Sequence, residues 1–377
     1  MLLLGNYVND GQESMQRFST CMAQGLAEAG HEVRLLRPSP IVGRLRPSWE
    51  GVGKWLGYVD KFGWFPIVLR SAVREADVVH VCDHANSFYT KYLQSVPNLV
   101  TCHDLLAIRS ARGEFPQNPT SWTGKHFQAH IVKSLMYAQH IACVSEATRN
   151  DLLRIAGIRE DRVSRVYNSL NYPYSRMEMS EAEPRLRRLS VQPDQPFLLH
   201  VGGNQWYKNR MGVLRIFSLL RKLSPSQDLK LVMAGKPWTD AMRRFVTENG
   251  LSGSTSELKA VADEDLRALY STATLLLFPS LEEGFGWPIV EAQACGCLVA
   301  TSNRSPMDEV AGDAAIYLDP ENPTLAATTL KGALDRLAIN REASLRNAAR
   351  FKSGMVDAYI ALYEKVRRDR EAGDRSN

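Results

Sequence analysis

Short apolar runs alternate with longer amphipathic stretches along the first half of the chain. The N-terminal run MLLLGN is typical of a strand, and the apolar residues after it recur at helical spacing as far as Gly30. Helix-like stretches such as KHFQAHIVKSLMYAQ separate further apolar runs, which are HEVRLL and residues 77–82, 98–102, 140–144 and 163–167. Because strands that alternate with helices form a parallel sheet covered on both faces, this pattern predicts an open α/β domain.

The alternation stops at residue 171 and starts again near residue 196. The segment 171–195 is polar, charged and interrupted by prolines, so it predicts a linker between domains at 1–170 and 196–352. Six more apolar runs follow: PFLLHVGG, DLKLVMAG, STSELKAV, TLLLFPS, CLVATS and AAIYLD. The last segment, 353–377, predicts a helix that crosses back to the first domain and ends in a charged tail. The expected fold class is α/β, with two Rossmann-like doubly wound parallel-sheet domains facing a cleft.

Composition excludes several classes of protein. Of the 377 residues, 44% are hydrophobic and 23% are charged, as in ordinary globular proteins and unlike disordered or collagen-like chains. The net charge of +5 suits anionic partners but is too small to predict nucleic-acid binding. Every apolar run is shorter than the about 20 residues that span a bilayer. MLLLGNYV has no basic leader, so we expect a cytoplasmic protein.

The segment 44–74 mixes cations with aromatic residues. Its members are Arg44, Arg46, Lys54, Lys61, Arg70 and Arg74, with Trp49, Trp55, Tyr58, Phe62, Trp64 and Phe65. Such mixing can mark a face that rests on anionic lipid at the inner side of a membrane. The alternative is an excursion whose aromatic rings pack on the domain while its cations face water.

Two loops that follow predicted strands combine glycines with charged residues. In LLHVGGNQWYKN, Gly203 and Lys208 lie between a strand and a helix, where backbone amides and a cation can bind a diphosphate. In LFPSLEEGFGWPIVE, the strand ends at Ser280 and Pro288 suits the first turn of the next helix. Either loop alone is compatible with a simple glycine turn. Two such loops in one domain support each other and predict a nucleotide site.

Glu283 and Glu291 lie eight positions apart across a Gly-Phe-Gly turn. Carboxylates repel phosphate, so this pair needs partners that carry hydroxyl groups, and one carboxylate can accept hydrogen bonds from two hydroxyls at once. We therefore predict that the two glutamates bind a ribose and a sugar on either side of the phosphates. We expect both side chains to face solvent when no donor is bound.

Several motifs resemble the retaining glycosyltransferases of family 4. In the second domain they are EGFGWPIVEAQACGCLVATSN, HVGGNQWYKN and VAGDAAIYLDP, and the family's E-x7-E motif corresponds here to Glu283 and Glu291. In the first domain the resemblance rests on AEAGHEVRLL, TCHDLLAI, ACVSEATRNDL and RVYNSLN. The resemblance implies the GT-B fold, transfer of a hexose such as mannose or glucose from a nucleotide-diphosphate sugar, and no cofactor or metal.

The resemblance also implies roles for single residues. His103 would lie beside the anomeric carbon and Glu283 at the donor sugar, which makes these two the candidate catalytic residues; His103 is also compatible with a structural role. Glu291 would hold the ribose and Lys208 the diphosphate. The implied donor-binding set is Gly203, Asn204, Lys208, Phe285, Gly286, Trp287 and Glu291. Acceptor contacts are expected in NYVNDGQESM, at Gly11 and Gln12.

The chain departs from the family pattern at the phosphate site. Many members carry an arginine five residues before the lysine, where this chain has Gly203. A second phosphate cation would have to come from elsewhere, with Arg210 and Arg304 as candidates. The family's Asn-Gly-x-Asp reads Asn-Ser-Leu-Asn at 168–171, which leaves the donor nucleotide open.

Three hypotheses from different classes remain. The leading hypothesis is a retaining glycosyltransferase that acts on a glycan, lipid-linked or small-molecule acceptor. The second is a nucleotide-sugar epimerase or another GT-B-fold enzyme, which would need no acceptor. The third is a non-catalytic protein that binds sugar nucleotides. Asp263 and Asp265 match the spelling of a metal site, but they open a predicted helix, where acidic residues are common.

Overall fold

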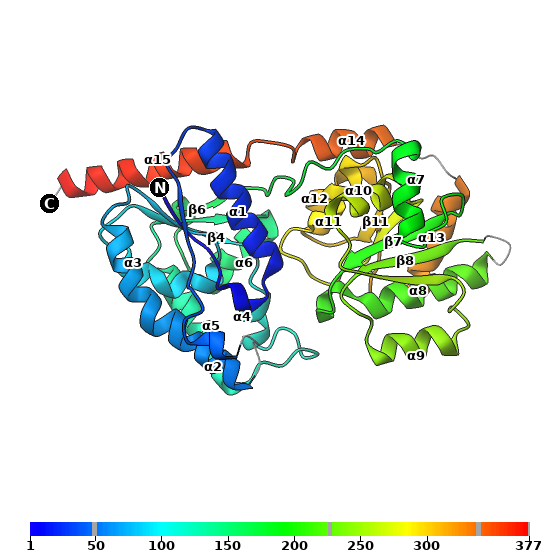
Figure 1. The fold of residues 1–377 in the computed structure, drawn as a ribbon, viewed down its shortest axis with the longest axis horizontal. Coiled ribbons are helices and arrows are strands. Elements are labelled where there is room, and N and C mark those ends of the chain that lie inside the picture. Colours follow the sequence, from blue (N-terminus) through cyan, green and yellow to red (C-terminus); the bar gives the residue numbers. More distant parts are fainter. Residues whose placement is uncertain (47–50, 225–227, 337–340, 376–377) are drawn as a thin grey trace. The chain divides into compact units, whose positions relative to one another are not determined.

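The computed structural model describes residues 1–46, 51–224, 228–336 and 341–375, and it contains two compact units (Figure 1). Unit 1 comprises Met1–Asn171 and Gly354–Asn377, and unit 2 comprises Tyr172–Ser353. Each unit has a six-stranded sheet in which all pairs are parallel. Helices cover these sheets (Figure 1). The predicted fold class of two doubly wound parallel-sheet domains is confirmed.

The sheet of unit 1 has the strand order β2-β1-β3-β4-β5-β6. Its strands are β1 (Leu2–Leu4), β2 (Arg34–Leu36), β3 (Val79–Val81), β4 (Asn98–Cys102), β5 (His140–Cys143) and β6 (Val163–Arg165). The central strands β1, β3, β4 and β5 are buried along their whole length, as expected of strands covered on both faces. The chain adds β2 on one side of β1 and then β3 on the other, so the order reverses at β1.

The helices of unit 1 connect its strands, except for the last, which comes after unit 2 along the chain. They are α1 (Glu13–Glu28), α2 (Gly51–Val59), α3 (Phe65–Val73), α4 (Leu106–Ala111), α5 (Trp122–Leu135), α6 (Glu146–Ala156) and α15 (Met355–Arg375). The side chain of Ser145 caps α6 by accepting from the amide of Thr148. The same helix ends at Gly157, whose φ of 61° lies in the left-handed region that favours glycine.

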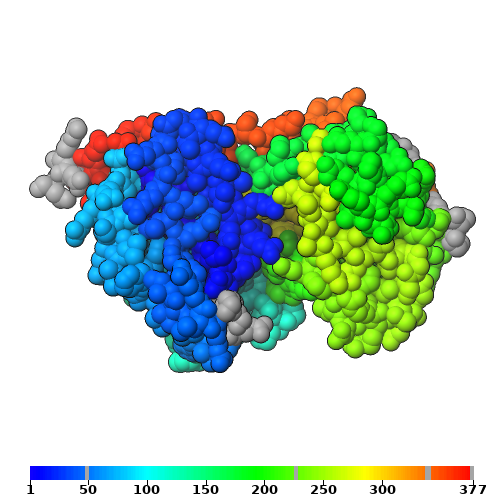
Figure 2. All heavy atoms as spheres, viewed as in Figure 1, coloured from blue at the N-terminus to red at the C-terminus, as the bar shows by residue number. Residues whose placement is uncertain are grey.

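The C-terminal helix α15 packs in unit 1, beside residues from the other end of the chain (Figure 2). Its Tyr359 hydroxyl lies 2.7 Å from the hydroxyl of Thr101, and its Tyr363 hydroxyl lies 2.9 Å from Nδ1 of His80. The Nε2 atom of His80 lies 2.7 Å from the Thr101 hydroxyl. All four side chains are buried, so this connected network fixes α15 on β3 and β4.

The sheet of unit 2 has the order β12-β11-β10-β7-β8-β9. Its strands are β7 (Phe197–Gly202), β8 (Lys230–Gly235), β9 (Thr255–Lys259), β10 (Leu275–Phe278), β11 (Val299–Ser302) and β12 (Ala315–Leu318). Its helices are α7 (Met179–Arg188), α8 (Arg210–Leu223), α9 (Asp240–Glu248), α10 (Asp263–Thr272), α11 (Trp287–Ala294), α12 (Met307–Ala311), α13 (Pro323–Arg336) and α14 (Arg341–Ala349). The order reverses between β7, which neighbours β8, and β10.

The segment expected to be a linker, 171–195, differs from that expectation because it contains helix α7. Ala182 and Leu186 lie one helical turn apart, and both are completely buried. The Arg185 guanidinium binds Asp265 of α10 at 3.0 Å. Pro184 removes one helical hydrogen bond, but packing on α10 compensates for that loss. The proline in the sequence alone could not predict this packing.

Candidate active site

The predicted donor-binding residues lie at the carboxyl edge of the sheet of unit 2, beside its reversal of strand order. Strand β7 pairs with β8 on one side and with β10 on the other. The predicted residues 203–208 follow β7, and residues 283–287 follow β10. In open parallel sheets, ligands bind outside the carboxyl ends of the strands where the order reverses. The structure thus brings the two predicted loops to the edge where this fold binds ligands.

Asn209 connects the loop after β7 to two neighbouring loops. Its backbone has a φ of 51°, a left-handed conformation that asparagine tolerates better than most residues. Its side-chain amide donates to the carbonyl oxygens of Pro279 at 3.0 Å and Pro320 at 3.2 Å. These contacts fix the start of α8 and hold the adjacent Lys208 in place.

Lys208 and Glu283 form an ion pair across the two loops. The lysine Nζ atom lies 2.7 Å from Oε1 and 2.9 Å from Oε2 of the glutamate. The two side chains are 17% and 6% exposed, so water screens the pair little. Nζ also lies 5.2 Å from the centre of the Phe278 ring. The expectation that Glu283 faces solvent is therefore wrong: in this structure its carboxylate neutralises the lysine.

Glu291 lies on α11 and points toward α10. Its Oε2 atom accepts a hydrogen bond of 2.9 Å from the Tyr270 hydroxyl. The residue is only 5% exposed, so the expectation that it faces solvent is also wrong. Burial, together with the neighbouring Glu291 carboxylate, raises the pKa of Tyr270 well above its usual value, which keeps the hydroxyl a donor.

The turn between the two glutamates has the geometry that its glycines predict. Gly286 precedes the first residue of α11 with a φ of 101°, where a side chain would be strained. Pro288 occupies the first turn of that helix, where its missing amide hydrogen is not needed. Phe285 is buried against Phe351, and Trp287 is partly exposed. The proposed contacts of these residues with a donor sugar stay predictions.

Arg210 is buried beside the loop after β7 and lacks a carboxylate partner within ion-pair distance among the described residues. Its Nη1 atom donates to Oδ1 of Asn204 at 2.5 Å and to the carbonyl of Lys236 at 2.7 Å, and the residue is 4% exposed. Its Nε and Nη2 atoms have no hydrogen-bond partner in the described residues. Arg304, the other candidate phosphate cation, pairs with Glu321 at 3.0 Å. Arg210 is therefore the better candidate.

His103 lies directly after β4, at the carboxyl edge of the sheet of unit 1. Its Nε2 atom lies 2.9 Å from the carbonyl oxygen of Cys82, and Phe18 packs edge-on against its ring at 4.7 Å. A carbonyl only accepts, so Nε2 carries the hydrogen. Burial lowers the pKa of His103, so the ring is neutral at pH 7 and its Nδ1 atom is unprotonated.

Sequence reasoning missed a polar cluster at the same edge of unit 1. Directly after β3, the Asp83 carboxylate accepts from the Asn6 amide at 2.6 Å and lies 3.2 Å from Nδ1 of His84. Burial opposes charge on both groups, but their mutual attraction outweighs it: the pKa of Asp83 falls and the pKa of His84 rises. The polar sequence DHAN directly after an apolar strand could have indicated this cluster, although we interpreted only the strand.

A second buried ion pair lies beside the predicted acceptor residues. The Lys61 ammonium contacts the Asp10 carboxylate at 2.7 Å, and these side chains are 8% and 10% exposed. Gly11 and Gln12 follow Asp10 directly and are exposed. Their predicted role in acceptor binding is not tested by this geometry. The ion pair of Asp10 and Lys61 was not predicted, because nothing in the local sequence indicates that the two residues would meet.

The metal-like acidic sequence at 263–265 has structural partners. Asp265 binds Arg185 at 3.0 Å and Arg188 at 2.9 Å, and the Asp263 carboxylate lies 3.4 Å from the Tyr174 hydroxyl. All three acidic residues lie in the first turn of α10, where negative charge is favourable. These contacts explain the acidic residues without a metal ion.

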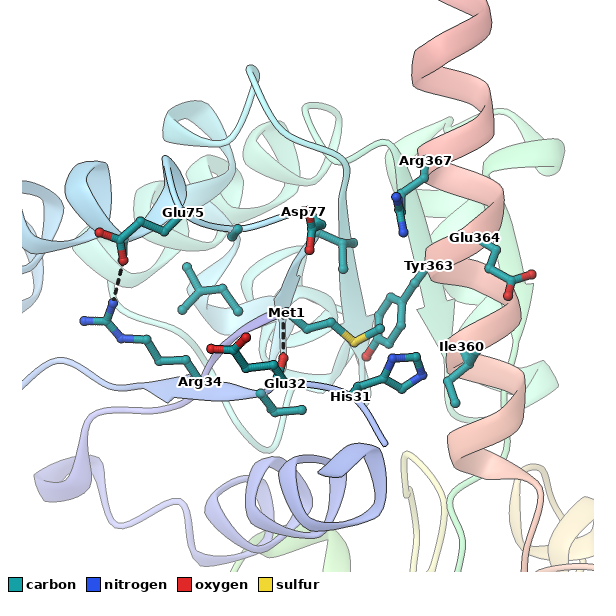
Figure 3. Close-up of a pocket in the computed structure, with 15 residues that line it drawn as sticks. Met1, His31, Glu32, Arg34, Glu75, Asp77, Ile360, Tyr363, Glu364 and Arg367 are labelled. Carbon is teal, nitrogen blue, oxygen red and sulfur yellow. Dashed lines mark hydrogen bonds and ion pairs between the residues drawn. The ribbon is translucent and has the colours of Figure 1, made fainter. Parts of the chain in front are cut away.

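A cavity of about 320 Å³ lies at the opposite, amino edge of the sheet of unit 1 (Figure 3). Residues at the starts of β1, β2 and β3 line it, together with Tyr363 and Arg367 of α15. Arg34 and Glu75 form an ion pair of 3.4 Å at its rim. Ligands of open parallel sheets bind at the carboxyl edge, so this cavity is not the candidate active site.

Two family models match the chain. Residues 15–172 match the model described as Glycosyltransferase Family 4, and residues 183–351 match Glycosyl transferases group 1. The O-antigen chain mannosyltransferase B of Escherichia coli is 30% identical over 200 residues, which are 52% of this chain and 52% of that protein. The chain thus spans about half the length of that relative.

Solved structures with the same architecture match nearly the whole chain. Sucrose-phosphate synthase from Thermosynechococcus elongatus has a TM-score of 0.73 at 16% identity, covering 97% of this chain and 98% of that one. HepE from Anabaena, crystallised with UDP and glucose, has a TM-score of 0.71 at 15% identity with the same coverage. At this identity the likeness shows the fold. The chain therefore has the GT-B fold, and along it a segment that matches Glycosyltransferase Family 4 is followed by one that matches Glycosyl transferases group 1.

Proposed function

We propose that this chain is a retaining hexosyltransferase that takes its sugar from a nucleotide-diphosphate donor without a metal ion. The acceptor is a glycan, a lipid-linked sugar or a small molecule. The observation that carries the proposal is the meeting of Lys208 and Glu283 across the two loops at the strand-order reversal. A cation and a carboxylate in contact there suit a ligand that combines phosphate with sugar hydroxyls.

Each group has a part in donor binding. Lys208 carries three N–H donors, so it can bind a phosphate oxygen while it still contacts Glu283. Arg210 adds a second positive charge and holds Asn204, a residue of the same loop. Glu283 then accepts from sugar hydroxyls, and Glu291 accepts from the ribose. The N-terminus of α11 adds a favourable dipole for the phosphates.

The reaction breaks the bond between the anomeric carbon and the β-phosphate oxygen, and it forms a bond from that carbon to the acceptor oxygen on the same face. The departing phosphate takes the proton of the acceptor hydroxyl, so the products are a nucleoside diphosphate and a glycoside of unchanged anomeric configuration. Lys208 and Arg210 meet the negative charge that grows on the leaving group. His103, neutral and unprotonated at Nδ1, can accept a hydrogen bond from a sugar hydroxyl without adding charge.

The relatives favour mannose as the transferred sugar. The Escherichia coli relative is a mannosyltransferase of the O-antigen chain. The HepE structure, which shares only the fold, contains UDP and glucose. We therefore propose mannose first and glucose second, and a direct comparison of GDP and UDP donors decides between them.

Donor turnover tests the proposal. Purified protein is incubated with GDP-mannose or UDP-glucose, with and without EDTA, and released nucleoside diphosphate and free sugar are measured. We expect slow hydrolysis of one donor that continues in EDTA and gives sugar of the donor's anomeric configuration at first release. An epimerised donor would indicate the second hypothesis, and binding without turnover in the presence of an acceptor mixture would indicate a non-catalytic protein. Activity that EDTA abolishes and manganese restores would refute metal independence.

A further inference from the structure

One helix on unit 1 has an unusual distribution of side chains. Helix α2, the π-helical segment Asp60–Trp64 and helix α3 follow one another without a break, so residues 51–73 form one long helix (Figure 1). We call it the 51–73 helix. Of the aromatic residues in the segment 44–74, Trp49 lies outside the described residues and Phe65 is buried. Among the described residues, no helix is both long and apolar enough to cross a membrane.

The 51–73 helix turns large apolar side chains toward solvent along its first half. Val52, Trp55 and Val59 are 55%, 70% and 53% exposed, and their spacing of three and four residues places them on one face. The buried positions in α2 are instead Gly53 and Gly57. A surface helix of a globular protein normally has the reverse arrangement, with apolar residues inward and polar residues outward.

Exposed apolar side chains also follow α2. Phe62, Trp64 and Ile67 are 42%, 52% and 60% exposed. Six large apolar side chains on one surface element exceed the scattered exposure that is normal for a monomer, and such a patch marks an interaction site. The patch extends along the helix, so it is a ridge and provides no pocket for a small ligand.

The exposed charged residues of this segment have one sign as far as Arg74, after which the exposed Glu75 pairs with Arg34. Within the described residues 44–46 and 51–74, the exposed charged side chains are all cations: Arg44, Arg46, Lys54, Arg70 and Arg74. Asp60, the acidic residue of this range, is buried. It accepts from the Tyr7 hydroxyl and the amides of Val42 and Gly43, each at 2.9 Å. Apolar and aromatic groups flanked by cations complement an anionic surface that has an apolar interior.

We propose that the 51–73 helix rests on an anionic lipid bilayer, with its apolar ridge among the acyl chains and its cations at the headgroups. Tryptophan is favoured at such an interface because its ring is apolar and its N–H stays near water. The ridge lies parallel to the surface and does not span the bilayer. Binding to a protein partner or to a second copy of the chain would not require cations alone along the ridge. The cations therefore favour lipid as the occupant.

The inner face of the same helix links the bilayer to the candidate acceptor edge. Asp60 and Lys61 point inward and contact Tyr7 and Asp10, which follow β1 at the carboxyl edge of the sheet. The helix is thus fixed to the loop that carries the predicted acceptor residues. On the proposed function, this favours an acceptor whose sugar is attached to a membrane lipid. The bilayer contact itself does not depend on that function.

Vesicle flotation tests the contact without donor or acceptor. We expect the protein to float with vesicles of phosphatidylcholine and phosphatidylglycerol, and to remain below vesicles of phosphatidylcholine alone. Replacing Lys54 and Arg74 by glutamine should weaken binding about fivefold for each cation. The double variant Trp55→Ser, Val59→Ser should weaken it by about tenfold or more, because apolar area can no longer be buried.

The matched control is Leu325→Ser, on α13 of unit 2. Leu325 is 52% exposed, close to the 53% of Val59, so its loss removes an exposed apolar side chain comparable to Val59. Its binding should equal that of the wild type, and circular dichroism should show all variants folded because the replaced side chains are exposed. Equal flotation with neutral and anionic vesicles, or unchanged binding of Trp55→Ser, Val59→Ser, would overturn the proposal. So would a dimer in solution that this double variant dissociates.

Discussion

Replacing Arg210 by methionine tests whether this cation binds a ligand or only stabilises the fold. Methionine has a similar length without charge, so it fills most of the buried space. In the wild type, Nη1 makes two hydrogen bonds, to Asn204 at 2.5 Å and to Lys236 at 2.7 Å, while Nε and Nη2 have no partner in the described residues. A buried guanidinium with unused donors is expected where an anionic ligand completes the site.

The two energetic effects of this substitution oppose each other. Loss of two charged hydrogen bonds costs about 1.5–3 kcal/mol each. Removal of a buried cation without a carboxylate partner recovers several kcal/mol of desolvation free energy. The same desolvation lowers the pKa of Arg210, because burial disfavours the charged form of the guanidinium. We therefore expect the free energy of unfolding to change by less than about 1.5 kcal/mol, whereas a purely structural staple would lose about 3–5 kcal/mol.

Nucleotide binding should respond far more strongly than stability. Loss of one charged contact to phosphate predicts about tenfold to a hundredfold weaker binding of the nucleoside diphosphate, measured by calorimetry beside urea unfolding. The matched control is Arg304→Met, which removes an arginine paired at the surface with Glu321. That variant should bind normally and change stability by at most about 1 kcal/mol. Strong destabilisation of Arg210→Met with unchanged nucleotide affinity would refute the reasoning.

Two further predictions concern the site, and a third concerns His200, a buried residue of β7. Glu283→Gln should lower kcat about tenfold to a hundredfold, because this carboxylate binds the sugar as charge develops, and steady-state kinetics with unchanged kcat would contradict its role. Glu291→Ala should mainly raise donor KM, and a wild-type KM would contradict ribose binding. Urea unfolding should also show a loss of about 1–3 kcal/mol in the free energy of unfolding, because the buried Tyr270 hydroxyl loses its acceptor. Burial lowers the pKa of His200 to about 3, so the unfolded state gains a proton first as pH falls. This histidine should therefore remove about 2 kcal/mol of stability between pH 7 and pH 5, and His200→Gln should reduce that loss in urea unfolding; an equal loss in both proteins would exclude this cause.

The fold was predictable because its strands carry strong local signals. All twelve predicted apolar runs contain a strand of the structure, since strands buried on both faces must be nearly continuous in apolar residues. Their order in the sheets was not predictable from those runs, because β1 pairs with both β2 and β3 through contacts far apart in sequence. Helix α7 was missed because packing on α10, which no local pattern records, outweighs Pro184.

The candidate site was predictable where one motif supplied its residues and not where distant segments meet. The glycines around Phe285 predicted the turn before α11 correctly, because only glycine suits the φ of 101° at Gly286. The contact of Lys208 with Glu283 joins residues 75 positions apart, and no sequence pattern indicated it. Lys61 was interpreted with its cationic neighbours as surface charge, yet it is buried against Asp10 because the helix turns it inward.

The ion pair of Lys208 and Glu283 explains how one site can hold opposite charges without a ligand. Two nearby groups that are 17% and 6% exposed would each pay a desolvation cost if unpaired, so their contact lowers the free energy of the donor-free state. On the proposed function, a donor offers phosphate to the lysine and hydroxyls to the glutamate, so both charges gain a partner together. A nucleoside diphosphate without sugar offers phosphate to the lysine but no hydroxyl group of a sugar to Glu283. The intact donor should therefore bind more tightly than its own nucleoside diphosphate, and Glu283→Gln should remove that difference.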